Sequence, residues 1–417
     1  MTTQASQPKA LSKTAVSLAT MMFLQYMFIA VWFVQLSAYL TNAGVSGVLK
    51  WFILSSMAVG SMASPVVCAL AGRFPAQKVL AIANAVTAVF LLGAALFHTN
   101  AILFGLCVLV AMIAYMPTWA LTSSIAMTHS DPKNFPLIRT FGTIGWVASA
   151  ICSVVAIYVF KVEKFDGTTL PLLCAVGIGV VAALQNLTLP DTPPGDAGDS
   201  KFSVSKVLGL EAFSLLRDRN YLVFIIGSFA TMIAFILYFS YSAQFLSEKG
   251  FANITLTLNL GQFAEMFFMA ATTVVLAKAG VKKALIFGVL AMVVRYLAFY
   301  IGDLNNIAAL YIFGILVHGL IFGWFFAGGQ VYTAQKAPKH LVAQAQGMFA
   351  FLIWGVGVLA GTFIYGTLID KVTKPAVAGV AAATNWSALF LGTAIFSALI
   401  LVFFALFFKE EATQKAE

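Results

Sequence analysis

Twelve long apolar segments occupy most of this chain. Each is close to or above the roughly 20 residues that an α-helix needs to cross the ~30 Å hydrocarbon core of a bilayer. Lipid offers no hydrogen-bond partner to an open backbone, so every segment is expected to be helical, and the continuous apolar runs exclude a β-barrel. The sequence predicts an all-α membrane protein with twelve transmembrane helices, at 14–40, 47–71, 78–97, 101–127, 135–160, 170–189, 221–247, 254–278, 283–302, 307–333, 341–369 and 384–408.

The composition agrees with a chain that lies mostly in lipid. Only 9% of its 417 residues are charged and 61% are hydrophobic, whereas about 25% of the residues of soluble chains are charged. With a mean hydropathy of +0.94, too few polar side chains remain to coat a soluble surface, which excludes a soluble enzyme, a nucleic-acid-binding module and a disordered chain. The four cysteines lie in apolar runs without CxxC spacing, so we expect buried small side chains and no metal site.

The net charge of +9 follows from membrane topology. If the N-terminus is cytoplasmic, 16 of the 24 Lys and Arg residues lie on the cytoplasmic side, six lie outside and two, Arg139 and Arg295, lie within spans. Basic residues concentrate on the cytoplasmic side of membrane proteins, so we expect both termini inside and no nucleic-acid partner. The first apolar run is too long for a signal-peptide core, so we interpret it as an uncleaved span.

One polar stretch divides the twelve spans six and six. Residues 190–220, beginning LPDTPPGDAGDSK, have the composition of a linker. We therefore expect an N-terminal six-helix bundle at 1–189, a cytoplasmic linker at 190–220 and a C-terminal six-helix bundle at 221–417. Two such halves are typical of major facilitator transporters, which rock one half against the other. The loop after the second span, with Gly72 and Arg73, matches the usual motif of that superfamily only in part.

Ionisable side chains inside the spans are the candidate functional groups, because each is costly in lipid. Glu265 is the only acid placed deep in a span, about 16 Å along the helix from residue 254. Gln262 is one turn earlier and shares its face. Glu265 is interpreted as a proton-titrating or substrate-binding carboxylate, the alternative being a structural pair with a neighbouring helix.

Three further ionisable residues lie within spans, and each could have either a functional or a structural role. His318 in the tenth span can carry a proton near neutral pH or can simply join helices. Arg295 is interpreted mainly as a structural partner for an acid or for backbone carbonyls. Arg139 shares a face with Thr143 and Trp146, where a guanidinium, a hydroxyl and an aromatic plane would meet; by spacing alone it could equally extend toward the interface.

Aromatic side chains make up 14% of the chain and most are expected to face lipid. A few should line the transport cavity, where a flat substrate could stack; the candidates are Trp32, Tyr115, Trp146 and Phe322. The phosphate-binding Gly-x4-Gly-Lys-Ser/Thr motif is absent. We therefore expect no nucleotide-driven pump, no catalysis and no cofactor; the energy must come from a gradient or from the substrate itself.

Several segments, taken together and in order, resemble the nucleoside:proton symporter family of the major facilitator superfamily. They are FLQYMFIAVW (23–32), YMPTWAL (115–121), FPLIRTFGTIGW (135–146), LPDTPP (189–194), LGLEAFSLLRDRNYLVF (208–224), GQFAEMFFM (261–269) and AQGMF (345–349). Within the family the chain looks nearer to the less characterised bacterial nucleoside transporters than to the broad-specificity permeases.

The resemblance implies proton-driven uptake of nucleosides across the bacterial inner membrane, with a substrate site between the halves. The residues that match this site are Arg139, Thr143, Trp146, Gln262, Glu265 and Phe322. We add His318, one turn from Phe322, expect Glu265 to be the proton-coupling group because it is the only deep acid, and expect the protein to act as a monomer. Gln25 and Gln346 lie in matching segments and join Trp32 and Tyr115 as cavity-lining candidates.

Four positions depart from the family pattern. Ile236 and Phe239 stand where the family has Gln and Asn, His318 replaces a Tyr, and Gly323 replaces an Asp. Because these family residues are missing, the substrate could be a modified nucleoside, or a sugar or other small polar solute that is transported with protons. A non-transporting membrane sensor is the third possibility, but it would be expected to carry an added soluble domain.

Overall fold

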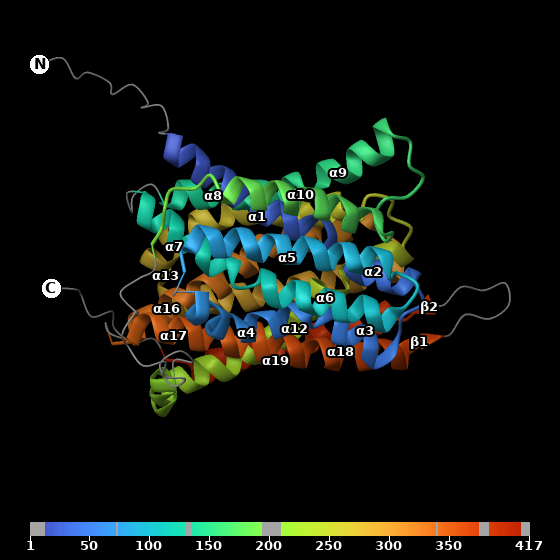
Figure 1. Cartoon of the computed structure of the whole chain (residues 1–417). Helices are drawn as coiled ribbons and strands as arrows, with labels where there is room; N and C mark the ends of the chain where they lie inside the picture. Colours follow the sequence, from blue (N-terminus) through green and yellow to red (C-terminus); the bar gives the residue numbers. More distant parts are fainter. Residues whose placement is uncertain are drawn as a thin grey trace, which may run out of the picture.

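The computed structural model describes residues 13–71, 74–130, 135–193, 210–338, 341–374 and 383–409. Arg73 and most of the expected linker lie outside these ranges. Long helices run side by side through the molecule, and both ends of the chain emerge at the same end of it (Figure 1). We call this the terminal end and the opposite one the far end.

The first group of helices contains short pieces that combine into spans. We call it the N-terminal group, and its elements are α1 (Lys13–Phe33), α2 (Leu36–Asn42), α3 (Gly47–Leu54), α4 (Ser56–Ala71), α5 (Ala76–Leu96), α6 (Ala101–Tyr115), α7 (Thr118–His129), α8 (Phe135–Ala148), α9 (Ala150–Val154), η1 (Val155–Val159) and α10 (Leu170–Asn186). Breaks occur where short interruptions such as Ser55, Pro117 and Ser149 separate consecutive helices. The described part of the chain thus contains the first six predicted spans.

The second group has longer helices and several π-helical turns. We call it the C-terminal group, and its elements are η2 (Leu210–Arg217), α12 (Arg219–Glu248), α13 (Ile254–Asn305), α14 (Ala308–Leu316), α15 (His318–Leu320), η3 (Ile321–Ala327), α16 (Gly328–Lys336), α17 (Val342–Ala350), η5 (Phe351–Gly357), α18 (Val358–Val372), β1 (Thr373–Lys374), β2 (Ala383–Thr384) and α19 (Trp386–Phe407). In α13 the backbone leaves the helical conformation at Gly280, where φ is 79°. A positive φ suits glycine, and this bend separates the predicted eighth and ninth spans.

The observed helices confirm the predicted fold class. In the described ranges, nine helices are long and apolar enough to cross a membrane, and α3 with α4 forms a tenth span bent by 44°. The apolar α10, at 17 residues, and the first part of α13 occupy the two remaining predicted positions. The paired strands β1 and β2, with Thr373 opposite Thr384, were not predicted; they lie at the far end, outside the spans (Figure 1).

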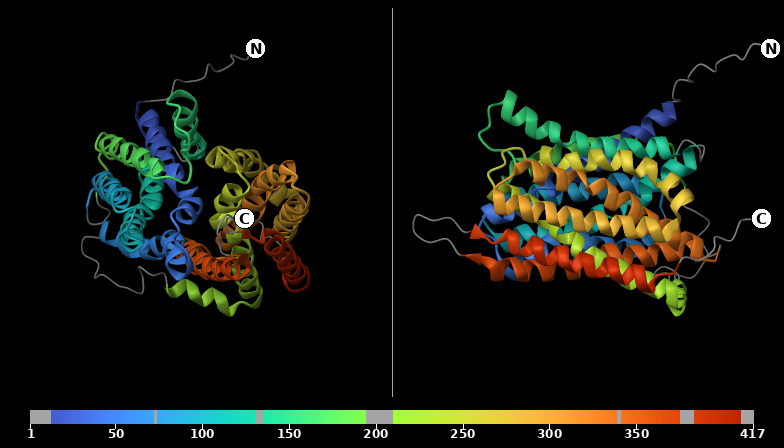
Figure 2. Two further views of the ribbon diagram at one scale, coloured as in Figure 1. Left: turned by 90° about the vertical axis from the view of Figure 1, so that its right-hand side faces the viewer. Right: turned by 180° about the vertical axis from the view of Figure 1, so that it is seen from behind.

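The outward faces of the helices are apolar, as lipid requires. Ile82, Leu184, Phe267 and Leu399 are each more than 60% exposed, which would be unfavourable in water but suits hydrocarbon. Seen end-on, the helices coloured blue to green gather mainly on one side and those coloured yellow to red on the other (Figure 2). This arrangement leaves one long interface between the two groups.

Glycine brings helices into close contact inside the N-terminal group. A Cβ atom added at Gly145 of α8 would lie 2.0 Å from the Phe23 carbonyl oxygen of α1. One added at Gly179 of α10 would lie 2.4 Å from the ring of Phe28. Small residues permit such approach between membrane helices, and here they set the position of α8, which carries Arg139 and Trp146.

Hydrogen bonds between described residues join the two groups along the far half of the interface. Lys50 Nζ donates to Gln244 Oε1 at 2.7 Å, and Ser37 Oγ accepts from the Gln244 N–H at 3.2 Å. Asp166 accepts from both the N–H and the hydroxyl of Thr255, at 3.1 and 2.6 Å. The far end is therefore held closed by polar contacts in this structure.

Candidate substrate site

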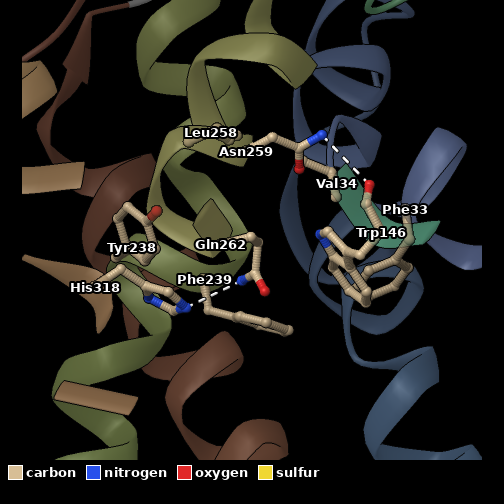
Figure 3. A pocket seen from close by; sticks show the side chains of 9 residues that line it. All are labelled: Phe33, Val34, Trp146, Tyr238, Phe239, Leu258, Asn259, Gln262 and His318. Carbon is tan, nitrogen blue, oxygen red and sulfur yellow. Dashed lines mark hydrogen bonds between the residues drawn. The ribbon is translucent and has the colours of Figure 1, made fainter. Parts of the chain in front are cut away.

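A small cavity lies between the two groups of helices, toward the middle of the molecule. Its volume is about 40 Å³, enough for a few water molecules but far below the roughly 300 Å³ at which small-molecule pockets begin. Side chains from α1, α8, α12, α13 and α15 converge on it (Figure 3). The lining residues are Phe33, Val34, Trp146, Tyr238, Phe239, Leu258, Asn259, Gln262 and His318.

His318, Gln262 and Glu265 form a polar cluster on the C-terminal side of this cavity. The Nε2 atom of His318 lies 3.1 Å from Gln262 Nε2 and 3.4 Å from Glu265 Oε2. The His318 side chain is 2% exposed and that of Glu265 12%. Sequence analysis predicted all three as site residues, and the structure brings them together although His318 is 56 positions from Gln262.

The two contacts of His318 Nε2 require opposite protonation states. The Gln262 amide nitrogen is a donor only, so this contact needs an unprotonated Nε2. The Glu265 carboxylate is an acceptor when ionised, so that contact needs a proton on Nε2. A proton on Nε2 would therefore favour Glu265 as the partner of His318, and its removal from Nε2 would favour Gln262.

Aromatic rings surround His318 and hold it in place. Its ring lies 5.3 Å from that of Tyr238, 5.7 Å from that of Phe235 and 5.8 Å from that of Phe322, between centroids. Phe322 is thus next to the cluster, as predicted, although it is not among the residues that line the cavity. Flat apolar walls with a few polar groups are typical of sites for small aromatic ligands.

A buried cation contacts Tyr238, one of the residues that line the cavity. The guanidinium carbon of Arg295 lies 3.9 Å from the centre of the Tyr238 ring, and Arg295 is 0% exposed. Its Nε donates to the Gly314 carbonyl at 3.0 Å. Arg295 therefore has the structural role expected for it, with a backbone carbonyl and an aromatic face as its partners.

On the N-terminal side, Arg139 packs on Tyr26 of α1. The guanidinium carbon lies 4.2 Å from the centre of the Tyr26 ring, and that ring stacks on Trp119 at 5.4 Å. A Cβ atom at Gly142 would come within 2.8 Å of both Arg139 Nη1 and the Tyr26 ring, so the glycine provides the space for this pairing.

Three of the cavity-lining candidates are buried inside the N-terminal group instead. Gln25, Trp32 and Tyr115 are each 1% exposed. Gln25 Nε2 donates to Thr118 Oγ1 at 2.6 Å, and its carbonyl oxygen Oε1 accepts from Asn84 at 2.9 Å. None of the three lines the cavity in this structure, and the network that satisfies Gln25 belongs to the packing of α1 against its neighbours. Their predicted place in the transport cavity stays a prediction.

The fourth candidate, Gln346, lies on α17 and donates to the Gln330 carbonyl of α16 at 2.6 Å. It joins two helices of the C-terminal group and is not a lining residue of the cavity. Thr143 and Arg139, both half-buried on α8, also lie outside the lining set. Their predicted part in binding stays a prediction.

The positions that differ from the family pattern have different surroundings in the structure. Ile236 is fully buried against Gly361 in the C-terminal group, whereas Phe239 lines the cavity. A Cβ atom at Gly323 would lie 3.0 Å from Thr272 Oγ1 and 3.1 Å from the Phe268 carbonyl oxygen. Position 323 is thus packed closely against α13, and a carboxylate there would require the helices to shift.

Sequence reasoning missed Tyr26, Tyr238 and Asn259. All three are placed by contacts between helices far apart in the chain, so spacing within one helix could not identify them. Among the described residues no group of three His, Cys, Asp or Glu side chains is arranged to hold a metal ion. The free cysteines in these ranges, Cys107, Cys152 and Cys174, are partly buried; Cys68 lies outside the described side chains.

Twelve apolar spans in two groups, with a polar cluster at their interface, define a multi-pass membrane transporter of the major facilitator type. A family model described as "Nucleoside H+ symporter" matches residues 12–413. YegT of Escherichia coli (strain K12) is 34% identical over 405 residues, covering 95% of this chain and 94% of YegT. The chain belongs to the nucleoside H+ symporter family.

Further comparisons agree with this assignment. Xanthosine permease of Escherichia coli (strain K12) is 27% identical, covering 93% of this chain and 95% of the permease. A mutant form of the nucleoside transporter NupG has a crystal structure that matches with a TM-score of 0.84 at 23% identity, covering 95% of this chain and all of that one. The structural match shows that the two proteins share a fold.

Proposed function

We propose that this protein imports nucleosides together with protons by alternating access. The observation that carries the proposal is the contact of one buried nitrogen, His318 Nε2, with both Gln262 and Glu265 at the interface between the groups. Membership of a family of symporters supports proton coupling. A titratable pair beside a cavity links protonation to the shape of the site.

The nucleoside is proposed to bind between the groups. Gln262, His318 and Trp146 already line the cavity, and Glu265 and Phe322 adjoin it. Arg139 and Thr143 on α8 would reach the same ligand from the N-terminal side. An aromatic plane such as Trp146 suits a nucleobase, while carboxamide, carboxylate and guanidinium groups suit ribose hydroxyls and base edges.

The size of the cavity requires a conformational change for this function. At about 40 Å³, the cavity cannot hold a nucleoside. The polar contacts between described residues of the two groups, such as Lys50 with Gln244, join the far half of the interface. Movement of one group against the other would enlarge the site from the terminal end while these contacts persist, and from the far end when they break.

Glu265 is proposed to be the principal proton-coupling residue, with His318 as its partner. In the ionised state the carboxylate attracts a protonated His318. When Glu265 takes up the proton, His318 is free to accept from Gln262, which changes the hydrogen-bond donors offered to the ligand. Each protonation state thus presents a different surface to the substrate.

We further propose that the protein lies in a bacterial inner membrane with both termini in the cytoplasm. The excess of Lys and Arg at the terminal end supports this orientation. The terminal end is then cytoplasmic and the far end extracellular. The bundles are proposed to divide at 190–220, to act as a monomer without a cofactor, and to perform no catalysis.

Proteoliposomes containing the purified protein would test the function. A panel of radiolabelled nucleosides, with a hexose for comparison, is offered with and without an inward proton gradient. We expect accumulation of at least one nucleoside only with the gradient. The variant Glu265→Gln keeps the size of the protonated acid, so it should retain exchange of nucleoside between the two sides but lose accumulation.

Exchange and accumulation, measured in the same vesicles, distinguish the proposed function from its alternatives. Accumulation by Glu265→Gln at the wild-type level would show that another group carries the proton. Uptake of the hexose with no response to nucleosides would replace the proposed substrate. Glu163→Gln, the same change at an exposed residue between η1 and α10, serves as the control and should transport as wild type does.

A further inference from the structure

Asn259 connects the two groups of helices at the cavity wall. It lies on α13 one turn before Gln262 and is 2% exposed. Its Nδ2 lies 3.2 Å from the Val147 carbonyl oxygen and 3.4 Å from both the Trp146 carbonyl oxygen and Ser149 Oγ. These partners are at the junction of α8 and α9, so one side-chain amide bonds to the opposite group directly beside the cavity (Figure 3).

The surrounding carbonyls determine which way the amide faces. Backbone carbonyl oxygens accept hydrogen bonds and never donate them, so only the NH₂ half of the Asn259 side chain can face Trp146 and Val147. The other half, Oδ1, must then face the other way, toward the cavity (Figure 3). Among the described residues Oδ1 is buried and has no hydrogen-bond donor.

A buried acceptor without a donor is unfavourable, and it is satisfied only when a donor comes within reach. The cavity beside Oδ1 is where a ligand would bring one. The same amide can therefore hold the opposite group through its nitrogen and accept from a ligand through its oxygen at the same time. Hydrogen bonds on the two ends of one amide polarise each other and strengthen together.

We propose that Asn259 is a positioning residue that couples ligand binding to closure of the extracellular end. With the groups closed, Nδ2 bonds to the α8–α9 junction and Oδ1 accepts from a hydroxyl or N–H of the ligand. When the extracellular end opens, α8 and α9 move away and Nδ2 loses these partners. A ligand that satisfies Oδ1 stabilises the closed arrangement. The identity of the ligand as a nucleoside rests on the proposed function; the link between the groups does not.

Hydrogen–deuterium exchange of the full-length protein in lipid nanodiscs would test the inference. Exchange is compared between peptides from the extracellular end, around residues 34–45 and 245–258, and peptides from the cytoplasmic end. Without ligand, Asn259→Leu removes both halves of the amide, and we expect at least threefold faster exchange at the extracellular end. Asn259→Asp keeps an acceptor but has no donor for the carbonyls, so it should open the same end.

Asn305 offers a control amide at the other end of α13, beyond the bend at Gly280. Its Nδ2 donates to the Ile301 carbonyl of its own span at 2.9 Å, and no hydrogen bond among the described residues joins it to the N-terminal group. Asn305→Leu and Asn305→Asp should leave exchange at both ends unchanged. Asn259→Ser supplies a smaller polar variant if Asn259→Leu does not fold. Exchange at the extracellular end equal to that of wild type in the folded Asn259 variants would overturn the proposal.

Exchange measured with added nucleoside tests this inference separately from the proposed function. Adding uridine or adenosine to the wild type should slow exchange at the extracellular end, and this effect should be lost in Asn259→Leu. Equal slowing in wild type and variant would show that Oδ1 does not sense the ligand, and would overturn the coupling. A wild type that responds to no nucleoside contradicts the proposed function, while the ligand-free comparison still decides whether Asn259 holds the groups together.

Discussion

The guanidinium carbon of Arg139 lies 4.2 Å from the centre of the Tyr26 ring. Cation–π contacts of this kind contribute about 0.5–2 kcal/mol, and this one positions a half-buried cation beside the interface between the two groups. The edge of the guanidinium stays available for hydrogen bonds while its face rests on the ring. Tyr26 therefore orients Arg139.

The first prediction concerns Arg139. We expect Arg139→Ala to weaken nucleoside binding at least tenfold, about 1.4 kcal/mol, because the ligand loses a charged donor. Arg139→Lys keeps the charge but not the fork of donors, so it should restore only part of the affinity. Binding to purified protein measured by calorimetry provides the comparison, and a folded Arg139→Ala protein with unchanged affinity would remove this residue from the site.

A second prediction concerns His318. His318→Phe keeps an aromatic ring among Tyr238, Phe235 and Phe322 but removes both ring nitrogens. We expect it to change the pH profile and the nucleoside preference of transport, because Gln262 and Glu265 lose their shared partner. His318→Tyr, the residue expected at this position in the family, should recover transport with a different pH dependence. Uptake measured from pH 5.5 to 8 tests both, and an unaltered profile in His318→Phe would make His318 a packing residue.

Gly145 allows a third prediction, on stability. An added methyl group would meet the Phe23 carbonyl at 2.0 Å, and overpacking of this kind costs about 1–3 kcal/mol or more. Gly145→Ala should therefore lower the melting temperature and reduce the yield of folded protein. Gly177 of α10 has no atom within 4 Å of an added Cβ, so Gly177→Ala should be neutral or slightly stabilising. Equal melting temperatures for the two variants would contradict the close contact of α1 with α8.

The fourth prediction concerns Asp218, which caps α12 at the cytoplasmic end of the proposed topology. Partial burial opposes ionisation, but the Tyr221 N–H, at 2.8 Å from Oδ1, and Lys336 Nζ, at 2.9 Å from Oδ2, outweigh it and lower the pKa of Asp218. A lowered pKa means stability that is present above the ordinary pKa of about 4 and lost as the pH falls through the folded value.

Two substitutions separate the cap from the charge. Asp218→Ala should cost about 1 kcal/mol at pH 7 through loss of the cap, and Asp218→Asn should cost less because its oxygen can still accept from Tyr221. Both should reduce the decrease in melting temperature that we expect of the wild type below about pH 4. The pair with Lys336 is only partly buried, so its contribution is expected to be small, and a large effect of Lys336→Met at pH 7 would contradict this assignment.

The number and positions of the spans could be predicted from the sequence because the bilayer imposes a length. About 20 apolar residues are needed for each crossing. Because this requirement concerns one segment at a time, each span can be recognised from its own residues. The polar residues Glu265, Gln262 and His318 could be identified for the same reason, since each stands out against an apolar run. The bend at Gly280 could also be predicted, because a short stretch of basic and small residues interrupts the apolar pattern there.

The contacts that convert those residues into a site depend on how the helices pack. Gln25 and Tyr115 occur in the matching segments yet face the interior of the N-terminal group, because Thr118 and Asn84 satisfy Gln25 there. Helical spacing places a residue on a face, but it does not say which neighbour that face will meet. The rotation of each helix is decided by its closest approaches, such as Gly145 against Phe23.

Sequence alone predicted the twelve spans and the small number of ionisable groups within them, because solvation by the bilayer acts on each segment independently. Only the tertiary structure decided that His318 Nε2 lies between Gln262 and Glu265, that Arg139 rests on Tyr26 and that Asn259 reaches across to the carbonyls of Trp146 and Val147. Hydrogen bonds and ring contacts act over a few ångströms, so they depend on the relative rotation and depth of helices that are remote in sequence.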